Sequence, residues 1–79
     1  MTEVVLPRLG STTMETAVIL RWWKRVGEMV SEGETLVEIE TDKADVEVPS
    51  PATGRLVGII QPEGATVPVG DVIARIKEG

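Results

Sequence analysis

The clearest alternation of apolar and polar residues runs from Val37 to Val48. An apolar residue at every second position is typical of a β-strand with one buried face. The alternation is reflected about Asp42-Lys43, so we predict a hairpin with these two residues at its tip. The predicted register pairs apolar residues across the buried side of the hairpin, Ile39 with Val46 and Val37 with Val48.

The opposite face of this hairpin is acidic. It carries four carboxylates, called the acidic collar below: Glu38 opposite Glu47, and Glu40 opposite Asp45. Like charges directly opposite each other on a sheet cost a few tenths of a kcal/mol per pair, roughly. Stability alone would not select this arrangement, and it surrounds a single lysine, Lys43. A surface lysine in an ordinary turn is the competing interpretation.

The remainder of the chain also has the features of short strands. Its 12 Val, 6 Ile and 8 Thr favour extended structure, and turn signals recur with no helix-length window between them. Strands this short and this numerous predict an all-β fold, either a sandwich or a flattened barrel.

An internal repeat organises the chain. Residues 15–39 align without a gap with residues 52–76 at a shift of 37, and the alignment matches apolar positions and glycines. The matched glycine pairs are Gly27 with Gly64 and Gly33 with Gly70. Each copy is too short to bury its own apolar face, so we expect the copies to pack around a pseudo-twofold axis. This symmetry places the segment after Ile39 opposite the C-terminus.

The first copy contains extra residues before its first strand. Residues 4–7 resemble residues 46–49 at a shift of 42, which predicts an excess of five residues before Glu15. We expect them to lengthen the loop at residues 10–14.

The composition excludes several kinds of chemistry. The chain has no His and no Cys, which removes thiol nucleophiles, Ser-His-Asp catalysis, disulfides and the usual zinc sites. The net charge of −5 argues against nucleic acid and anionic membranes as partners and favours proteins. We expect no metal site, since the spacing of Glu32, Glu34, Glu38 and Glu40 does not fit a calcium loop. Any reactive group would have to come from outside the chain's own side chains.

No apolar run reaches the roughly 20 residues of a membrane span, and the N-terminus does not resemble a secretory signal. The expected location is the cytoplasm, or the mitochondrial matrix in a eukaryote.

One segment, Arg21-Trp22-Trp23-Lys24-Arg25, places aromatic residues between cations, as in some nucleic-acid-binding surfaces. Strand alternation instead predicts that Trp22 faces the core with Val18 and Leu20. Trp23 would then be an exposed platform beneath arginine side chains. We interpret the segment as packing.

The motif Glu40-Thr41-Asp42-Lys43-Ala44 makes a family resemblance specific. Together with residues 6–10, 26–36 and 48–54, it resembles the lipoyl domain of the acyltransferase component of 2-oxo acid dehydrogenase complexes. The resemblance implies two four-stranded antiparallel sheets forming a flattened β-barrel with quasi-twofold symmetry. The chain would be one domain, residues 1–79, the N-terminal module of a longer acyltransferase.

The resemblance also implies a function and a site. Lys43 would carry lipoic acid through an amide, with Asp42 and Ala44 as flanking motif residues. As a swinging arm, it would accept an acyl group from a thiamine-diphosphate-dependent dehydrogenase and deliver it to an acyltransferase site for transfer to coenzyme A. Dihydrolipoyl dehydrogenase and lipoate-attaching enzymes would be further partners. The isolated domain would be a non-catalytic monomer.

Partner recognition would lie on the surface around Lys43. The resemblance assigns it to the loop between the first two strands, and Glu40 and Asp45 of the collar would contribute. The loop residues are Gly10, Ser11, Thr12, Thr13 and Met14. An ordinary variable connection is the alternative for this loop.

Two other functions share this pattern. A biotinyl carrier domain has the same fold and hairpin lysine but places the lysine between methionines, which Asp42 and Ala44 disfavour. An unmodified lipoyl-like hairpin could instead serve as a structural adaptor.

Overall fold

The computed structural model describes residues 1–8 and 15–79, and this part of the chain forms an elongated all-β domain of 36 × 22 × 17 Å. Its strands, in chain order, are β1 (Thr2–Val5), β2 (Thr16–Trp22), β3 (Met29–Val30), β4 (Thr35–Glu40), β5 (Asp45–Pro49), β6 (Gly54–Ile59), β7 (Thr66–Pro68) and β8 (Val72–Lys77). No helix among the described residues is long and apolar enough to cross a membrane.

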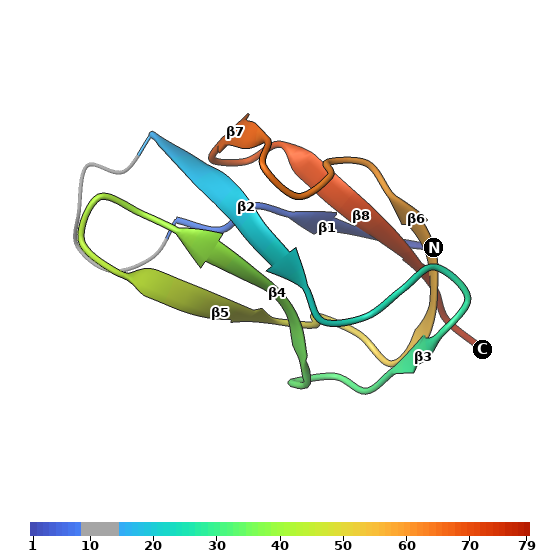
Figure 1. Cartoon of the computed structure of the whole chain (residues 1–79). Coiled ribbons are helices and arrows are strands. Elements are labelled where there is room, and N and C mark those ends of the chain that lie inside the picture. Colours follow the sequence, from blue (N-terminus) through green and yellow to red (C-terminus); the bar gives the residue numbers. More distant parts are fainter. Residues whose placement is uncertain (9–14) are drawn as a thin grey trace.

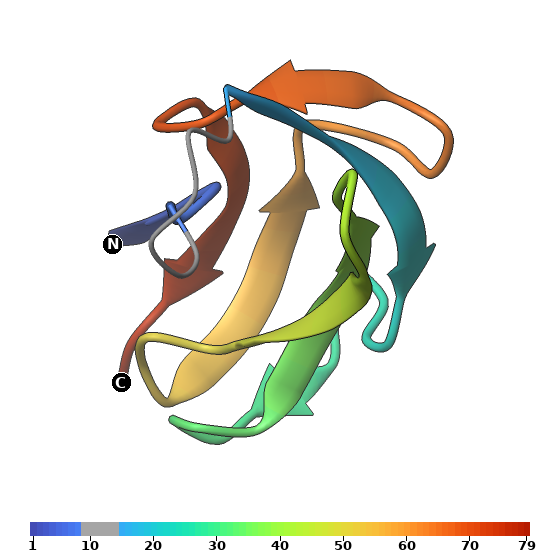
Figure 2. The ribbon, with the colours of Figure 1, turned by 90° about the vertical axis from the view of Figure 1, so that its left-hand side faces the viewer.

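The strands form two antiparallel four-stranded sheets, ordered β1-β8-β6-β3 and β5-β4-β2-β7. The sheets face each other, as the end-on view in Figure 2 shows. Their inner sides bury Leu6, Ile19, Leu36, Ile39, Leu56, Ile73 and Ile76 completely. One side of each strand enters this shared core. Segments in which β-branched residues alternate with polar ones fit this arrangement and therefore form the strands.

The two expected forms of the fold can now be separated. The described strand pairings do not close the sheets into a true barrel, so the fold is a sandwich. Backbone hydrogen bonds prolong one pairing within each sheet past the strand ends: Leu6 N–H donates to Asp71 O at 2.9 Å beside β1 and β8, and Ser50 N–H donates to Glu34 O at 2.8 Å beside β5 and β4. The expected fold, a flattened barrel or sandwich of two four-stranded antiparallel sheets, is confirmed, and it is open because the outer strands β1, β3, β5 and β7 each pair on one side only within the described residues.

The quasi-twofold symmetry is confirmed, down to the irregularities. Shifting the β2–β4 pairs by 37 residues reproduces the β6–β8 pairs, so Ile19↔Ile39 becomes Leu56↔Ile76. A bulge follows Ile19 in one sheet and Leu56 in the other. The matched glycines all have positive φ, between 88° and 99°, which favours glycine at these turns.

The extra length of the first copy needs a correction. Val4 pairs with Ala74 in one sheet as Val48 pairs with Val37 in the other, so β1 and β5 correspond at a shift of 44 instead of 42. The excess over the 37-residue repeat is therefore seven residues, not five. The apparent match at 42 arose because alternating strands look alike after any even shift.

The bulge in β2 overturns part of the predicted face. Val18 and Leu20 are only half-buried, whereas Ala17 and Ile19 are buried and Trp22 packs against the core. The bulge after Ile19 reverses the alternation, so Trp22 does not share a face with Val18 and Leu20. The predicted exposure of Trp23 is confirmed, and the Arg21 guanidinium carbon lies 4.7 Å from its ring centroid.

Candidate functional site: the tip of the β4–β5 hairpin

The hairpin formed by β4 and β5 positions the candidate site. Its register is the predicted one: Ile39 pairs with Val46, Val37 with Val48, Glu38 with Glu47, and Glu40 with Asp45. Ile39, Val37 and Val48 are buried, and Val46 packs against the core. The apolar face therefore fixes the stem, and it leaves residues 41–44 as the loop.

The loop lies at one end of the molecule, and both termini lie at the other (Figure 1). Asp42, Lys43 and Ala44 are all exposed at this tip. The arrangement matches the expectation from the repeat, since the loop after Ile39 corresponds to the chain end after Ile76.

Thr41 organises the loop, a role that the sequence reasoning missed. Its N–H donates to Ala44 O at 2.9 Å, and its hydroxyl donates to the same oxygen at 2.8 Å. The hydroxyl also accepts the N–H groups of Lys43, at 3.3 Å, and of Ala44, at 3.2 Å. The sequence signal for this role is a Thr directly before a tight turn, because its hydroxyl can form a hydrogen bond with the turn backbone in place of another backbone group.

These bonds explain how Asp-Lys can occupy the tip. Type I′ and II′ turns need positive φ, which Asn-Gly and similar pairs supply. No described residue other than glycine has positive φ, so Asp42 and Lys43 do not form such a turn. The Thr41 hydroxyl instead satisfies the Ala44 N–H, and it holds the backbone on both sides of the lysine.

The Lys43 side chain is uncommitted. Within the described parts of the chain, it makes no hydrogen bond or ion pair. The acidic collar lies on the stem below it, with Glu40, Asp45 and Glu47 exposed and Glu38 half-buried. Among the described residues, no three acidic side chains gather closely enough to hold a metal ion.

The other two lysines of the chain differ from Lys43. Lys24 Nζ lies 3.1 Å from a Glu34 carboxylate oxygen. Lys77 ends β8 opposite Arg55, at the end of the molecule that carries the termini. Lys43 is thus the lysine on an exposed hairpin tip, where a long arm could be attached without displacing packed side chains.

A groove of about 380 Å³ adjoins the tip. Glu15, Thr16, Ala17 and Val18 line one side, and Glu40, Thr41 and Asp42 line the other. The structure thus brings the start of β2 beside Glu40 and Asp42, while Asp45 lies across the hairpin from Glu40. The predicted recognition residues Gly10, Ser11, Thr12, Thr13 and Met14 lie outside the described residues.

Comparisons with known proteins agree with this geometry. Residues 2–76 match the Biotin_lipoyl family model, described as biotin-requiring enzyme. The chain also resembles the solution structure of a lipoyl domain of the 2-oxoglutarate dehydrogenase complex from Azotobacter vinelandii. The TM-score is 0.78 and the identity 32%, over 98% of this chain and 96% of that one.

Similar curated proteins are much longer than this chain. One is the dihydrolipoyllysine-residue acetyltransferase component of pyruvate dehydrogenase complex from Mycobacterium bovis, 52% identical over 92% of this chain and 13% of the relative. Another is the dihydrolipoyllysine-residue succinyltransferase component of 2-oxoglutarate dehydrogenase complex from Bartonella vinsonii subsp. berkhoffii, 46% identical over 99% of this chain and 19% of the relative.

Proposed function

The chain belongs to the Biotin_lipoyl family and is a lipoyl domain, and we propose that it carries lipoic acid as an amide on Lys43. The observation that carries this assignment is the Lys43 side chain, which is exposed at the hairpin tip and unpaired within the described residues. An amide at Nζ needs an accessible primary amine and room for an arm, and this tip offers both. Once bound, lipoic acid would supply the sulfur chemistry that a chain without Cys lacks.

The protein's own contribution is presentation. The Thr41 hydroxyl holds the backbone on either side of Lys43, and the buried stem fixes the direction of the hairpin. Amide formation removes one positive charge, so the net charge changes from −5 to −6. The carboxylates of Glu40 and Asp42 remain beside the groove, where a partner protein can bind them.

We also propose that the domain is the N-terminal module of a longer acyltransferase and serves a 2-oxo acid dehydrogenase complex. Relatives that are acetyl- and succinyltransferase components support this class of complex. A thiamine-diphosphate-dependent dehydrogenase would load the arm, and an acyltransferase site would unload it to coenzyme A. Dihydrolipoyl dehydrogenase would then reoxidise the dithiol of the arm. Tethering raises the effective concentration of the arm at each of these sites.

The attachment site is tested by intact mass after expression with lipoate, biotin and the enzymes that attach them. We expect a mass increase equal to lipoic acid minus water on the wild-type chain and on Lys77→Arg. Lys43→Arg should gain nothing, although it keeps the charge. A biotin adduct would identify a biotinyl carrier instead, and an unmodified wild-type chain would favour the adaptor function.

The class of complex is tested separately. The lipoylated domain is offered to a panel of purified thiamine-dependent dehydrogenases, each with its own 2-oxo acid, and reductive acylation is followed by mass. We expect acylation by one member well above the others. Equal failure with every member would contradict the proposed partners while leaving lipoylation of Lys43 intact.

A further inference from the structure

A second surface, far from Lys43, is built from the cationic and aromatic segment that the carrier function does not use. We call residues 21–26 and 59–63 the basic-aromatic surface; eight of them line a groove of about 690 Å³, whereas Trp23 lies outside its lining. Thr16, at the start of β2, lines the groove beside the hairpin tip, whereas Trp22, at its end, lines this one. The two residues are six positions apart along the strand, which is about 20 Å at roughly 3.3 Å per residue.

The internal repeat provides a control for what the fold needs at this place. Residues 58–62 of the second copy, Gly-Ile-Ile-Gln-Pro, stand where the first copy has Arg-Trp-Trp-Lys-Arg. The backbone is the same in both copies: Trp23 N–H donates to Leu36 O, and Ile60 N–H to Ile73 O, each at 2.9 Å. Residues 58–62 of the second copy form the same backbone arrangement without a charged side chain, so the fold does not require the cations of the first copy.

The cations of this segment are not equally available. Lys24 lies 3.1 Å from a Glu34 carboxylate oxygen, and the Ser31 N–H donates to that carboxylate at 3.0 Å. These two contacts, the Ser31 hydrogen bond first, hold the pKa of Glu34 below its usual value. Lys24 is therefore already neutralised within the domain.

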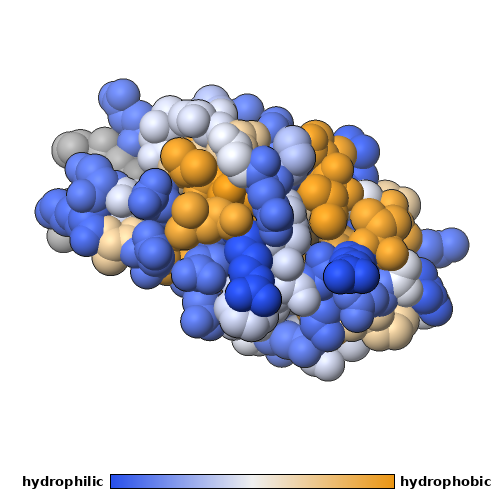
Figure 3. Space-filling view, in the orientation of Figure 1, coloured by the Kyte–Doolittle hydropathy of each residue, from blue (hydrophilic) through white to orange (hydrophobic). Residues whose placement is uncertain are grey.

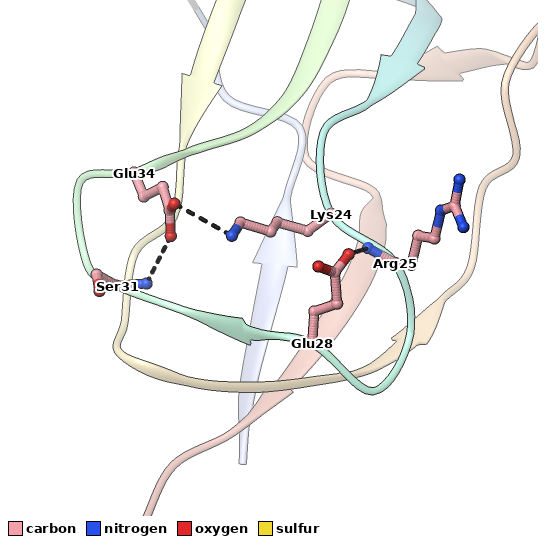
Figure 4. Close-up of polar contacts among 5 residues, drawn as sticks. All are labelled: Lys24, Arg25, Glu28, Ser31 and Glu34. Carbon is pink, nitrogen blue, oxygen red and sulfur yellow. Dashed lines mark hydrogen bonds and ion pairs between the residues drawn. The ribbon is translucent and has the colours of Figure 1, made fainter.

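The guanidinium groups of Arg21 and Arg25 are open to a ligand. Arg25 uses its backbone N–H to bind Glu28 at 2.7 Å, while its side chain points away from this cluster (Figure 4). The Arg21 guanidinium lies over the Trp23 ring, a geometry that orients it and leaves its edge exposed. Two exposed guanidiniums, that of Arg21 oriented by the ring, form a recognition element for carboxylates, which guanidinium groups bind in a bidentate manner.

Apolar side chains are exposed beside them. Trp23 is 45% exposed and Val26 57% exposed, and Ile59 lines the groove. In the view of Figure 3, hydrophobic residues gather in two areas, one over β2 and one towards the end with the termini, with hydrophilic residues around both. An exposed Trp flanked by Arg residues is typical of the residues that dominate binding energy at protein interfaces.

We propose that the basic-aromatic surface docks an acidic segment of a partner protein, with one apolar side chain in the groove and carboxylates on Arg21 and Arg25. Charge complementarity supports a polypeptide over nucleic acid. Glu63 also lines the groove, where its carboxylate accepts the Trp22 N–H at 3.0 Å, and a continuous polyphosphate would be repelled by it. A peptide can space its carboxylates to avoid Glu63. This surface operates independently of modification at Lys43.

The test uses the intrinsic fluorescence of the two tryptophans, both of which lie on this surface. The probe is a synthetic Glu-rich peptide with one central Phe, titrated at low salt. Comparison probes replace Glu by Gln or Phe by Ser, and a thymidine oligonucleotide represents nucleic acid. We expect a saturable shift with the first probe only, weakened about tenfold in the Arg21→Gln, Arg25→Gln double variant.

Matched variants control for charge and for apolar area. Arg75→Gln removes a cation from the other sheet, and Met29→Ala removes an exposed apolar side chain elsewhere; both should bind the peptide like the wild type. Equal binding by the double variant, or no saturable shift, would overturn the proposal. Tighter binding of the oligonucleotide would overturn it in favour of a nucleic-acid surface. Circular dichroism confirms that each variant is folded.

Discussion

At the residue scale, the backbone conformation around Lys43 depends on Thr41, two positions before it. Thr41 bonds the backbone of both Lys43 and Ala44, so one hydroxyl sets the shape of the loop. The sequence showed which lysine lies at the tip, because reflection of the pattern marks the tip. It did not show the role of Thr41, because the hydroxyl acts through hydrogen bonds that only the folded loop brings together.

Replacing Thr41 with Val keeps the shape of the side chain and removes these bonds. We expect the free energy of unfolding to fall by about 1 kcal/mol, the usual worth of a lost hydrogen bond. The amides of Lys43 and Ala44 should exchange faster with solvent, and the attaching enzyme should modify Lys43 several-fold more slowly. Amide exchange by NMR and the rate of lipoylation by mass measure both effects.

Thr41→Ser is the control, since it keeps the hydroxyl and should restore exchange and modification to near the wild-type rates. Unchanged amide exchange in Thr41→Val would show that the hydroxyl does not hold the loop.

At the element scale, the hairpin register follows from side-chain alternation, whereas the bulges do not. Slipping β5 by one residue against β4 would turn Val46 and Val48 towards solvent, which favours the predicted register over this slip. The bulge after Ile19 inserts one extra residue into β2, and the alternation of apolar and polar residues does not predict it. This bulge is the reason why Trp22 packs against the core although Val18 and Leu20, an even number of residues before it, are only half-buried.

Gly54 illustrates a constraint that appears only when strands are paired. A Cβ at this position would lie 2.4 Å from Lys77 O and 2.9 Å from an Ile76 side-chain carbon. We expect Gly54→Ala to lower the free energy of unfolding by about 1–3 kcal/mol, as overpacking does. Urea unfolding measures the change.

Gly58 lies on the same strand, and a Cβ there would meet nothing within 4 Å. Gly58→Ala should therefore leave stability unchanged or raise it slightly, since Ala also restricts the unfolded chain. Equal losses in both variants would mean that the close approach of β8 to Gly54 is not what makes glycine necessary.

At the scale of the whole molecule, two repeats build a single core. Ile39 and Ile76 occupy equivalent positions at the shift of 37, and both are fully buried. We expect Ile39→Val and Ile76→Val each to lower the free energy of unfolding by about 1 kcal/mol, because each removes one buried methylene. Urea unfolding of both variants tests whether the two halves contribute equally.

Ile60→Val is the reference, because Ile60 is 41% exposed and its loss should be well below 0.5 kcal/mol, roughly. A large loss for only one of the two buried variants would contradict the energetic equivalence of the repeats.

The sequence alone determined the strand content, the repeat, the hairpin register and the position of Lys43 at its tip. These features depend on local alternation and on glycines at turns, which are visible along the chain. Only the tertiary structure decided that the sheets form a sandwich, that the first copy has seven extra residues, and that Thr41 holds the loop. It also separated the neutralised Lys24 from the open Arg21 and Arg25. These features depend on contacts between residues distant in sequence or on loop geometry, and alternation carries no information about either.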